Sequence, residues 1–196
     1  MRIGVMGGTF DPIHVAHLVL AEQAREQLAL DKVLFIPAGD PWRKAGREIT
    51  PARHRLAMTR LAVQGNDGFE VDDCEVRREG PTYTLDTLRE LRGRPGMEPD
   101  DELFVLVGED ALADLPHWHD PAGIAAEAFI VVAPRDGADT PEMLPFDRER
   151  LAYIEMPYME VSATELRSRA RLGRSLRYLV PEPVLAYIIE NDLYQA

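Results

Sequence analysis

The stretch that decides the fold is Gly7-Gly8-Thr9-Phe10-Asp11-Pro12-Ile13-His14-Val15-Ala16-His17, which follows directly on a short apolar run. The two glycines allow backbone to come close to a ligand, and Pro12 ends the extended segment. His14 and His17 stand three residues apart where a helix is expected to begin, and a helix N-terminus attracts phosphate through its unpaired N–H groups. The stretch therefore predicts a phosphate site made by a strand, a glycine turn and a helix.

Apolar runs and helical repeats alternate along the rest of the chain, which is typical of an α/β fold. We predict a doubly wound, Rossmann-like parallel sheet with helices on both faces, in one domain over residues 1–196, with a core of about 1–160 and a C-terminal helical part of about 161–196. The helix near 51–64 is expected to begin with Thr50 as its cap and Pro51 at its first position. Strands are expected near 2–6, 32–37, 69–77, 103–108, 128–133 and 152–155, helices near 14–28, 51–64, 84–91, 162–172 and 183–190, with a short helix ending near 115, a turn-rich linker at 93–101, and loops at 38–50 and 136–145.

Composition narrows the function classes. The formal net charge of −12 argues against a protein that coats nucleic acid, although it leaves room for a local phosphate site. No apolar run approaches the ~20 residues of a membrane helix, and the single cysteine, Cys74, excludes an internal disulfide. We therefore expect a cytoplasmic protein with neither nucleic acid nor a membrane as its partner. Most of the arginine clusters are expected to lie on solvated helix faces.

Several common motifs do not occur in the sequence. It has no Gly-x-x-x-x-Gly-Lys loop, no Gly-x-Gly-x-x-Gly after the first strand and no Gly-x-Ser-x-Gly elbow. A metal site is the competing interpretation of His14 and His17, but the His-Glu-x-x-His spacing is missing and no third ligand is evident.

Two further segments carry polar groups suited to nucleotides. Gly108 follows the most apolar strand, where a glycine permits close backbone approach, and Asp110 offers an acceptor for ribose hydroxyls. Ser162 and Glu165 match a capping box, which explains those two residues. Thr164 and Arg167 remain unexplained by capping, and a hydroxyl beside a guanidinium in a first helical turn predicts a second anion site.

The whole pattern resembles a known family. Residues 7–17 resemble the signature of the nucleotidyltransferase superfamily that carries a His/Thr-x-Gly-His motif, and most of the chain resembles the bacterial nicotinate-mononucleotide adenylyltransferases. The chain departs from the family at Ala16, where glycine is usual, and the added methyl group is expected to crowd the adenine or ribose. Other matching stretches are Ile36-Pro37-Ala38-Gly39 with Lys44, Pro81-Thr82-Tyr83-Thr84-Leu85-Asp86-Thr87-Leu88, Gly108-Glu109-Asp110 with Leu115 and Trp118, and Ser162-Ala163-Thr164-Glu165-Leu166-Arg167.

The resemblance implies an activity and a set of site residues. The implied reaction moves AMP from ATP to nicotinate mononucleotide, with Mg²⁺, and gives nicotinate adenine dinucleotide and pyrophosphate in NAD biosynthesis. The resemblance implies that Trp118 stacks on the pyridine ring and that Thr84 and backbone near His119 contact the carboxylate of that ring. The implied catalytic residues are His14, His17, Lys44 and Arg167; the implied ATP-binding residues are Gly7, Gly8, Thr9, Phe10, His14, His17, Gly108, Asp110, Ser162, Thr164 and Arg167; the implied mononucleotide-binding residues are Gly8, Thr9, Phe10, Lys44, Thr84, Trp118 and His119, and none is implied to bind metal.

Other functions stay open at this point. A sister adenylyltransferase would use nicotinamide mononucleotide or phosphopantetheine, and a nucleotide-binding sensor would bind without turnover. A metal-dependent hydrolase is a more distant alternative. The sequence does not decide whether the chain forms a homo-oligomer.

Overall fold

The computed structural model describes residues 1–41, 49–133 and 144–195, without the side chain of Asp110. Its sheet has the order β3-β2-β1-β4-β5-β6, and every neighbouring pair is parallel. The strands are β1 (Arg2–Gly8), β2 (Lys32–Pro37), β3 (Phe69–Val71), β4 (Glu102–Gly108), β5 (Phe129–Ala133) and β6 (Leu151–Tyr153).

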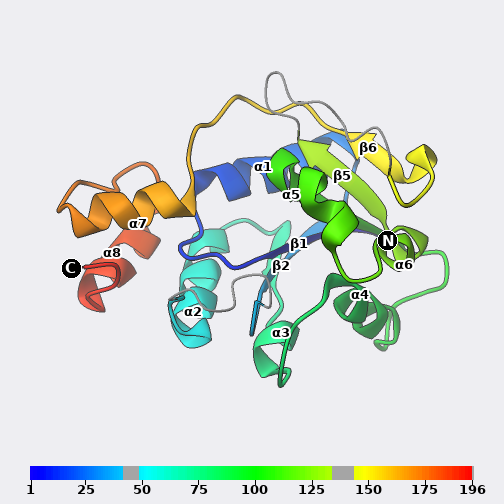
Figure 1. Ribbon diagram of the computed structural model, residues 1–196, viewed down its shortest axis with the longest axis horizontal. Coiled ribbons are helices and arrows are strands. Elements are labelled where there is room, and N and C mark those ends of the chain that lie inside the picture. The colour runs from blue at the N-terminus through cyan, green and yellow to red at the C-terminus, as the bar shows by residue number, and fades with distance from the viewer. Residues whose placement is uncertain (42–48, 134–143, 196) are drawn as a thin grey trace.

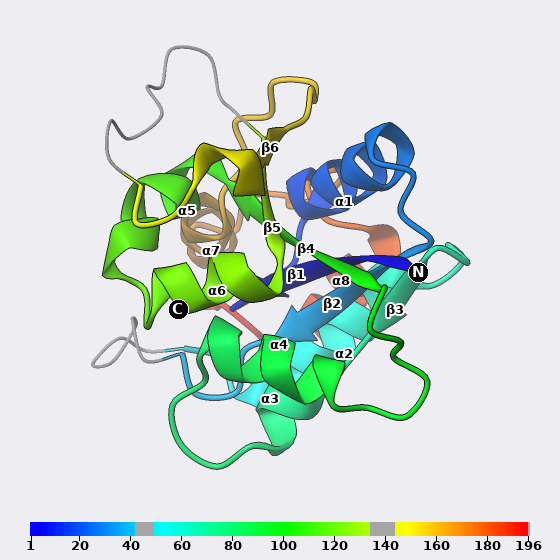
Figure 2. The same ribbon diagram turned by 90° about the vertical axis from the view of Figure 1, so that its right-hand side faces the viewer.

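Helices cover both faces of this sheet, so the predicted doubly wound α/β fold is confirmed (Figures 1 and 2). The connecting helices are α1 (Val15–Gln27), α2 (Ala52–Val63), α3 (Cys74–Arg77), α4 (Thr84–Arg92), α5 (Glu109–Asp114) and α6 (Pro121–Glu127), with 3-10 turns η2 (Leu115–His117) and η3 (Arg148–Arg150). The chain closes with α7 (Ala163–Arg171) and α8 (Glu182–Glu190), which lie at the opposite end of the molecule from α4 and α6 (Figure 1).

The core has two layers because strand side chains alternate between the faces. Met6, Phe35 and Val131 point to one layer, which packs against α1, α2, α7 and α8. Val5 and Ile36 point to the other layer, which packs against α3, α4, α5 and α6. Strands buried on both faces explain why these segments are almost continuously apolar in sequence.

Most of the predicted elements begin and end within two residues of the observed bounds, but the strand expected over 69–77 is wrong beyond Val71. An Asp72 Oδ1 accepts from the backbone N–H of Cys74 at 2.9 Å, and the chain turns there into α3. An aspartate that bonds backbone two residues on forms a turn, which competes with strand pairing. The alternation of apolar and polar residues therefore does not predict the conformation of the chain beyond Asp72.

The helix start expected near residue 50 is also corrected. Pro51 is the N-cap residue of α2, so Thr50 is not the cap. The carbonyl oxygen of Thr50 instead accepts from Arg55 Nε at 2.8 Å. Helix α6 was not predicted; Asp120 caps it by accepting from Gly123 N at 2.9 Å. The loops expected at 38–50 and 136–145 lie largely outside the described residues.

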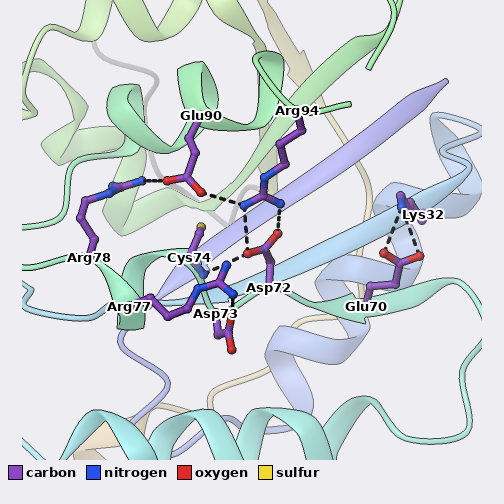
Figure 3. Close-up of polar contacts among 9 residues, drawn as sticks. All are labelled: Lys32, Glu70, Asp72, Asp73, Cys74, Arg77, Arg78, Glu90 and Arg94. Carbon is purple, nitrogen blue, oxygen red and sulfur yellow. Dashed lines mark hydrogen bonds and ion pairs between the residues drawn. The ribbon is translucent and has the colours of Figure 1, made fainter. Parts of the chain in front are cut away.

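A chain of charged side chains joins α3 to α4 (Figure 3). Arg94 forms ion pairs with Asp72 and, at 2.9 Å, with Glu90. Glu90 in turn pairs with Arg78 Nη2 at 2.5 Å. Cys74 lies beneath this chain with 3% exposure, and burial raises the pKa of its thiol to about 12. The charges therefore fix the position of two short helices that have little helical stability of their own.

In the ranges that the structure describes, no helix is long and apolar enough to cross a membrane.

Asp72 makes the stability of this region sensitive to acid. Burial alone would raise the pKa of Asp72, but the bonds from Arg94 and from Cys74 N–H outweigh burial and hold that pKa below its ordinary value. The stabilisation is therefore complete above the unfolded pKa of about 4 and is lost as the pH falls through the lower folded pKa. We expect Asp72→Asn to lower the free energy of unfolding at pH 7 by about 1 kcal/mol and to flatten its fall as the pH drops below about 4.

Urea unfolding at a series of pH values measures this effect. Asp100→Asn, in an exposed turn, is the matched control and should leave the acid profile unchanged. Identical acid profiles for wild type and Asp72→Asn would contradict the assignment.

Candidate active site

A cavity of about 810 Å³ lies at the carboxyl ends of the central strands. Gly7 and Gly8 of β1, Ile36 of β2 and Val107 of β4 contribute to its wall. Strand β1 pairs with β2 on one side and with β4 on the other, so the cavity opens where the strand order reverses. Ligands of open α/β sheets bind at this switch point.

The turn after β1 places His17 on the cavity. Phe10 has a positive φ of 49° and turns its ring into the core, where it is 2% exposed. The ring meets His17 edge-on with centroids 5.1 Å apart. A side chain at Gly8 would put its Cβ only 2.8 Å from Phe10 Cε1, so glycine is required for this arrangement. Phe10 thus supports the imidazole of His17, which lines the cavity.

The two histidines meet as their spacing predicts. His14 is the N-cap residue of α1 and is 6% exposed. Its ring stacks on that of His17 with centroids 3.7 Å apart and an angle of 28° between the planes. Both imidazoles therefore sit at the end of α1 where the helix dipole is positive.

A hydrogen bond determines which nitrogen of His17 carries the proton. The backbone N–H of His14 donates to Nδ1 of His17 at 3.2 Å. Because Nδ1 accepts, the proton of the neutral ring is assigned to Nε2. A neutral His17 can therefore act as a donor through Nε2.

Helix α7 brings the second predicted anion site to the same loop. Ser162 caps α7 by accepting from Glu165 N at 3.2 Å. Arg167 Nη1 donates to the carbonyl oxygen of Asp11 at 2.7 Å, and Nη2 lies 3.4 Å from Thr164 Oγ1. Residues more than 150 positions apart in sequence are thus joined beside the histidine pair.

Another part of the cavity wall is aromatic. Thr84, at the start of α4, lines the cavity with Trp118 and His119. The rings of Tyr83 and His119 lie 4.5 Å apart. Trp118 Nε1 is buried and has no hydrogen-bond partner among the described residues. A buried indole N–H usually has a partner, so this donor is suited to an acceptor on a ligand.

The cavity also holds polar residues that the sequence analysis did not single out. Glu75, Thr82 and Thr87 line it and are 7%, 6% and 2% exposed. Thr87 Oγ1 donates to Glu75 Oε1 at 2.7 Å and accepts from Arg78 Nη1 at 3.1 Å. Burial raises the pKa of the Glu75 carboxyl. No sequence signal distinguishes Glu75 from the surface acids around it, because its burial depends on α3 and α4 being packed together.

A buried arginine holds the loops at the cavity mouth. Arg55 is 1% exposed, and its guanidinium donates to the carbonyl oxygens of Thr9 at 2.8 Å, Gly39 at 3.0 Å and Thr50 at 2.8 Å. These three carbonyls come from the turn after β1, the turn after β2 and the residue before the N-cap of α2. Most arginines were expected on solvated helix faces, and only the tertiary structure shows that Arg55 is an exception.

The remaining predicted residues are placed as follows. Gly7, Gly8 and Thr9 line the cavity, as do His17, Thr84, Trp118 and His119. Gly108 is exposed at the end of β4 and is the N-cap residue of α5. Lys44 lies outside the described residues, and so does the side chain of Asp110. The roles given to all of these residues stay predictions.

The chain belongs to the cytidylyltransferase-like family, whose profile matches residues 5–169, and this makes it a nucleotidyltransferase. Among similar proteins is a probable nicotinate-nucleotide adenylyltransferase of Thermomicrobium roseum, 46% identical over 199 residues that cover 99% of this chain and 92% of the relative. Another of the same name, from Roseiflexus sp. strain RS-1, is 48% identical and covers 98% of each chain.

Solved structures share the fold. The nicotinic acid mononucleotide adenylyltransferase of Plasmodium falciparum complexed with NaAD has a TM-score of 0.78 at 18% identity, and the match covers 98% of this chain and 97% of that one. The same Plasmodium protein complexed with APC gives a TM-score of 0.72. The predicted family and fold class are therefore confirmed.

Arg55 provides a test of the loop geometry. We expect Arg55→Met to lower the free energy of unfolding by about 3 kcal/mol or more, because three partly buried carbonyls lose a charged donor that is itself buried. Urea unfolding checks this, with Arg53→Met, an exposed neighbour on α2, as the control that should change little. Surface substitutions change the free energy of unfolding by up to about 0.5 kcal/mol. A smaller loss than that in Arg55→Met would show that the three bonds from Arg55 are not needed for stability.

Proposed function

We propose that this protein transfers AMP from ATP to nicotinate mononucleotide, giving nicotinate adenine dinucleotide and pyrophosphate. The observation that carries the proposal is the stacked pair of His14 and His17 at the start of α1, with Arg167 bonded to the carbonyl oxygen of Asp11 three positions before His14. The names of the relatives at 46% and 48% identity support the substrate. The structures bound to NaAD and APC support a pyridine dinucleotide and an adenine nucleotide as ligands of this fold.

The reaction asks little acid–base chemistry of the protein. The attacking atom is a phosphate oxygen of the mononucleotide, which is already ionised at neutral pH. The oxygen forms a bond to the α-phosphorus of ATP while the bond from that phosphorus to the bridging oxygen breaks, and pyrophosphate leaves. The main barrier is the alignment of two anions in line.

The described residues supply donors for these anions. Neutral His17 donates through Nε2, and Arg167 adds a fixed positive charge from α7. Lys44 is proposed to contribute a further cation. Preorganised donors of this kind stabilise charge that builds up in the transition state and need no reorganisation during the reaction.

We propose that Mg²⁺ arrives with ATP and lowers the charge of the pyrophosphate. Magnesium commonly keeps several waters and binds through substrate phosphates, with few protein ligands. Within residues 1–41, 49–133 and 144–195 there is no group of three or more His, Cys, Asp or Glu side chains that could hold a metal ion.

The aromatic part of the cavity favours the acid over the amide. Trp118 offers its ring face and a buried N–H without a described partner, and Thr84 offers a hydroxyl at the start of α4. The indole N–H of Trp118 can only donate, so it can pair with either oxygen of a carboxylate but cannot pair with the NH₂ group of an amide. A reaction in the cytoplasm is proposed on the composition alone.

The decisive assay incubates the protein with ATP and Mg²⁺ and, in parallel, with nicotinate mononucleotide, nicotinamide mononucleotide and phosphopantetheine. Mass spectrometry identifies the product. The proposal is supported if product forms fastest with nicotinate mononucleotide and that product is nicotinate adenine dinucleotide. Faster product formation with either of the other two acceptors identifies a sister enzyme. Nucleotide binding without pyrophosphate release in any arm would identify a sensor.

His17→Ala is expected to lower kcat roughly 100- to 1000-fold because it removes one preorganised donor. The fold should survive, since the ring lies on the cavity wall and is only partly buried. His117→Ala, whose side chain is 77% exposed, serves as the control and should keep wild-type turnover. Unchanged kcat in a folded His17→Ala would remove His17 from the mechanism.

Thr84→Val tests recognition of the carboxylate. Loss of a hydrogen bond to a charged group should raise KM for nicotinate mononucleotide about 10-fold, while KM for ATP changes little. KM for nicotinamide mononucleotide should rise less. Equal increases for acid and amide would show that Thr84 does not read the carboxylate.

A further inference from the structure

The histidine loop comprises residues 9–17, which run from the turn after β1 into the first turn of α1. The carboxylate of Asp11 in this loop is buried and is held by distant segments. Asp11 is 2% exposed. Its Oδ1 accepts from the hydroxyl of Tyr194 at 2.7 Å, and its Oδ2 accepts from the backbone N–H of Thr50 at 3.3 Å. A buried carboxylate needs such donors, because each one that is lost leaves charge uncompensated.

The same residue connects the parts of the proposed site. Its carbonyl oxygen accepts from Arg167 of α7, as described above, and its side chain reaches Thr50 just before α2. Asp11 lies three positions before His14 in sequence. A shift of Asp11 would therefore move the histidine loop and the docking point of Arg167 together.

The donor on Tyr194 comes from the last turn of the chain. Tyr194 has a φ of 63° and follows α8. Burial, together with the neighbouring charge of Asp11, raises the pKa of the Tyr194 hydroxyl, so the hydroxyl remains protonated and can donate at any physiological pH.

A second contact ties the C-terminal segment to the same loop. The backbone N–H of Val15, the first residue of α1, donates to the carbonyl oxygen of Leu179 at 3.1 Å. This bond satisfies one of the N–H groups that a helix leaves unpaired at its start. The chain after α7 thus braces the histidine loop at Asp11 and at Val15.

We infer that Tyr194 is a positioning residue for the transfer reaction: through Asp11 it fixes the loop that carries His14 and His17 and the point where Arg167 docks. This inference rests on the proposed function. The geometry gives Tyr194 no direct role toward the nucleotide, so its effect must pass through Asp11. Misplacement of catalytic groups by about 1 Å is enough to lower turnover strongly.

The chain offers a matched pair of variants. Tyr194→Phe removes the hydroxyl bonded to Asp11. Tyr187→Phe removes a second tyrosine hydroxyl of the C-terminal part, which lies 3.0 Å from His54 Nδ1 and contacts neither Asp11 nor the histidine loop in any described bond. Both substitutions keep the ring and each removes one hydroxyl. A purely structural role predicts that both act on stability alone.

The experiment measures the thermal midpoint of unfolding for wild type and the two variants. It then measures kcat and both KM values at a temperature well below the lowest of these midpoints. Tyr194→Phe should lower kcat roughly 10-fold or more, as expected for a lost bond to a charged group, and Tyr187→Phe should stay within about twofold. In an Asp11→Asn background, Tyr194→Phe should change kcat far less than in wild type.

A second readout keeps the inference separate from the proposed function. Calorimetry with a non-hydrolysable ATP analogue and Mg²⁺ should show weaker binding for Tyr194→Phe than for Tyr187→Phe, even if no acceptor gives a product. Turnover and analogue binding of Tyr194→Phe within twofold of wild type would overturn the inference. So would a loss of kcat in Tyr187→Phe as large as in Tyr194→Phe.

Discussion

The buried guanidinium of Arg55 needs hydrogen-bond acceptors, and the loops around the site supply them. Its three carbonyl acceptors come from two connections: Thr9 follows β1, and Gly39 and Thr50 lie near the two ends of the segment between β2 and α2. These segments cannot move apart without leaving a charge unsatisfied in the interior. The turn after β1 also contains Asp11. Burial lowers the pKa of Arg55, and the neighbouring negative charge of Asp11 partly offsets that effect. Buried polar contacts thus hold in place loops that the two apolar core layers do not hold.

The site combines two kinds of chemistry on one sheet edge. At the start of α1, the stacked imidazoles lie at the positive end of the helix dipole, in a chain whose net charge is −12. Elsewhere the wall of the same cavity includes Thr84 of α4 and Trp118, which directly follows η2, on the opposite face of the sheet. The two core layers therefore meet at the cavity, and each supplies one part of it. Local charge, and not the average over the surface, determines which anions can bind.

Sequence reasoning succeeded where local patterns decide the structure. The parallel sheet follows from apolar runs that alternate with helices, and the position of His14 and His17 on the same side of a helix start follows from their spacing. It failed at Asp72, where one side-chain hydrogen bond turns the chain, and at Thr50, whose peptide groups bond to Arg55 and Asp11.

The residues that brace the site were beyond prediction for a different reason. Tyr194 and Asp11 are 183 positions apart, and nothing in either local sequence marks the bond between them. Glu75 and Arg55 likewise resemble exposed charges until the fold encloses them. The family resemblance names residues that would touch ligands, whereas the partners of those residues emerge only from the tertiary structure.

The burial of Cys74 has a practical consequence. Its thiol is enclosed and its pKa is about 12, so almost none is present as the reactive thiolate at neutral pH. Alkylating dyes should therefore not react with Cys74 in the native protein. A cysteine introduced at an outward position such as Tyr178, which is 84% exposed, would accept one fluorophore selectively. The chain is thus already suited to single-site labelling for spectroscopic studies of its motion.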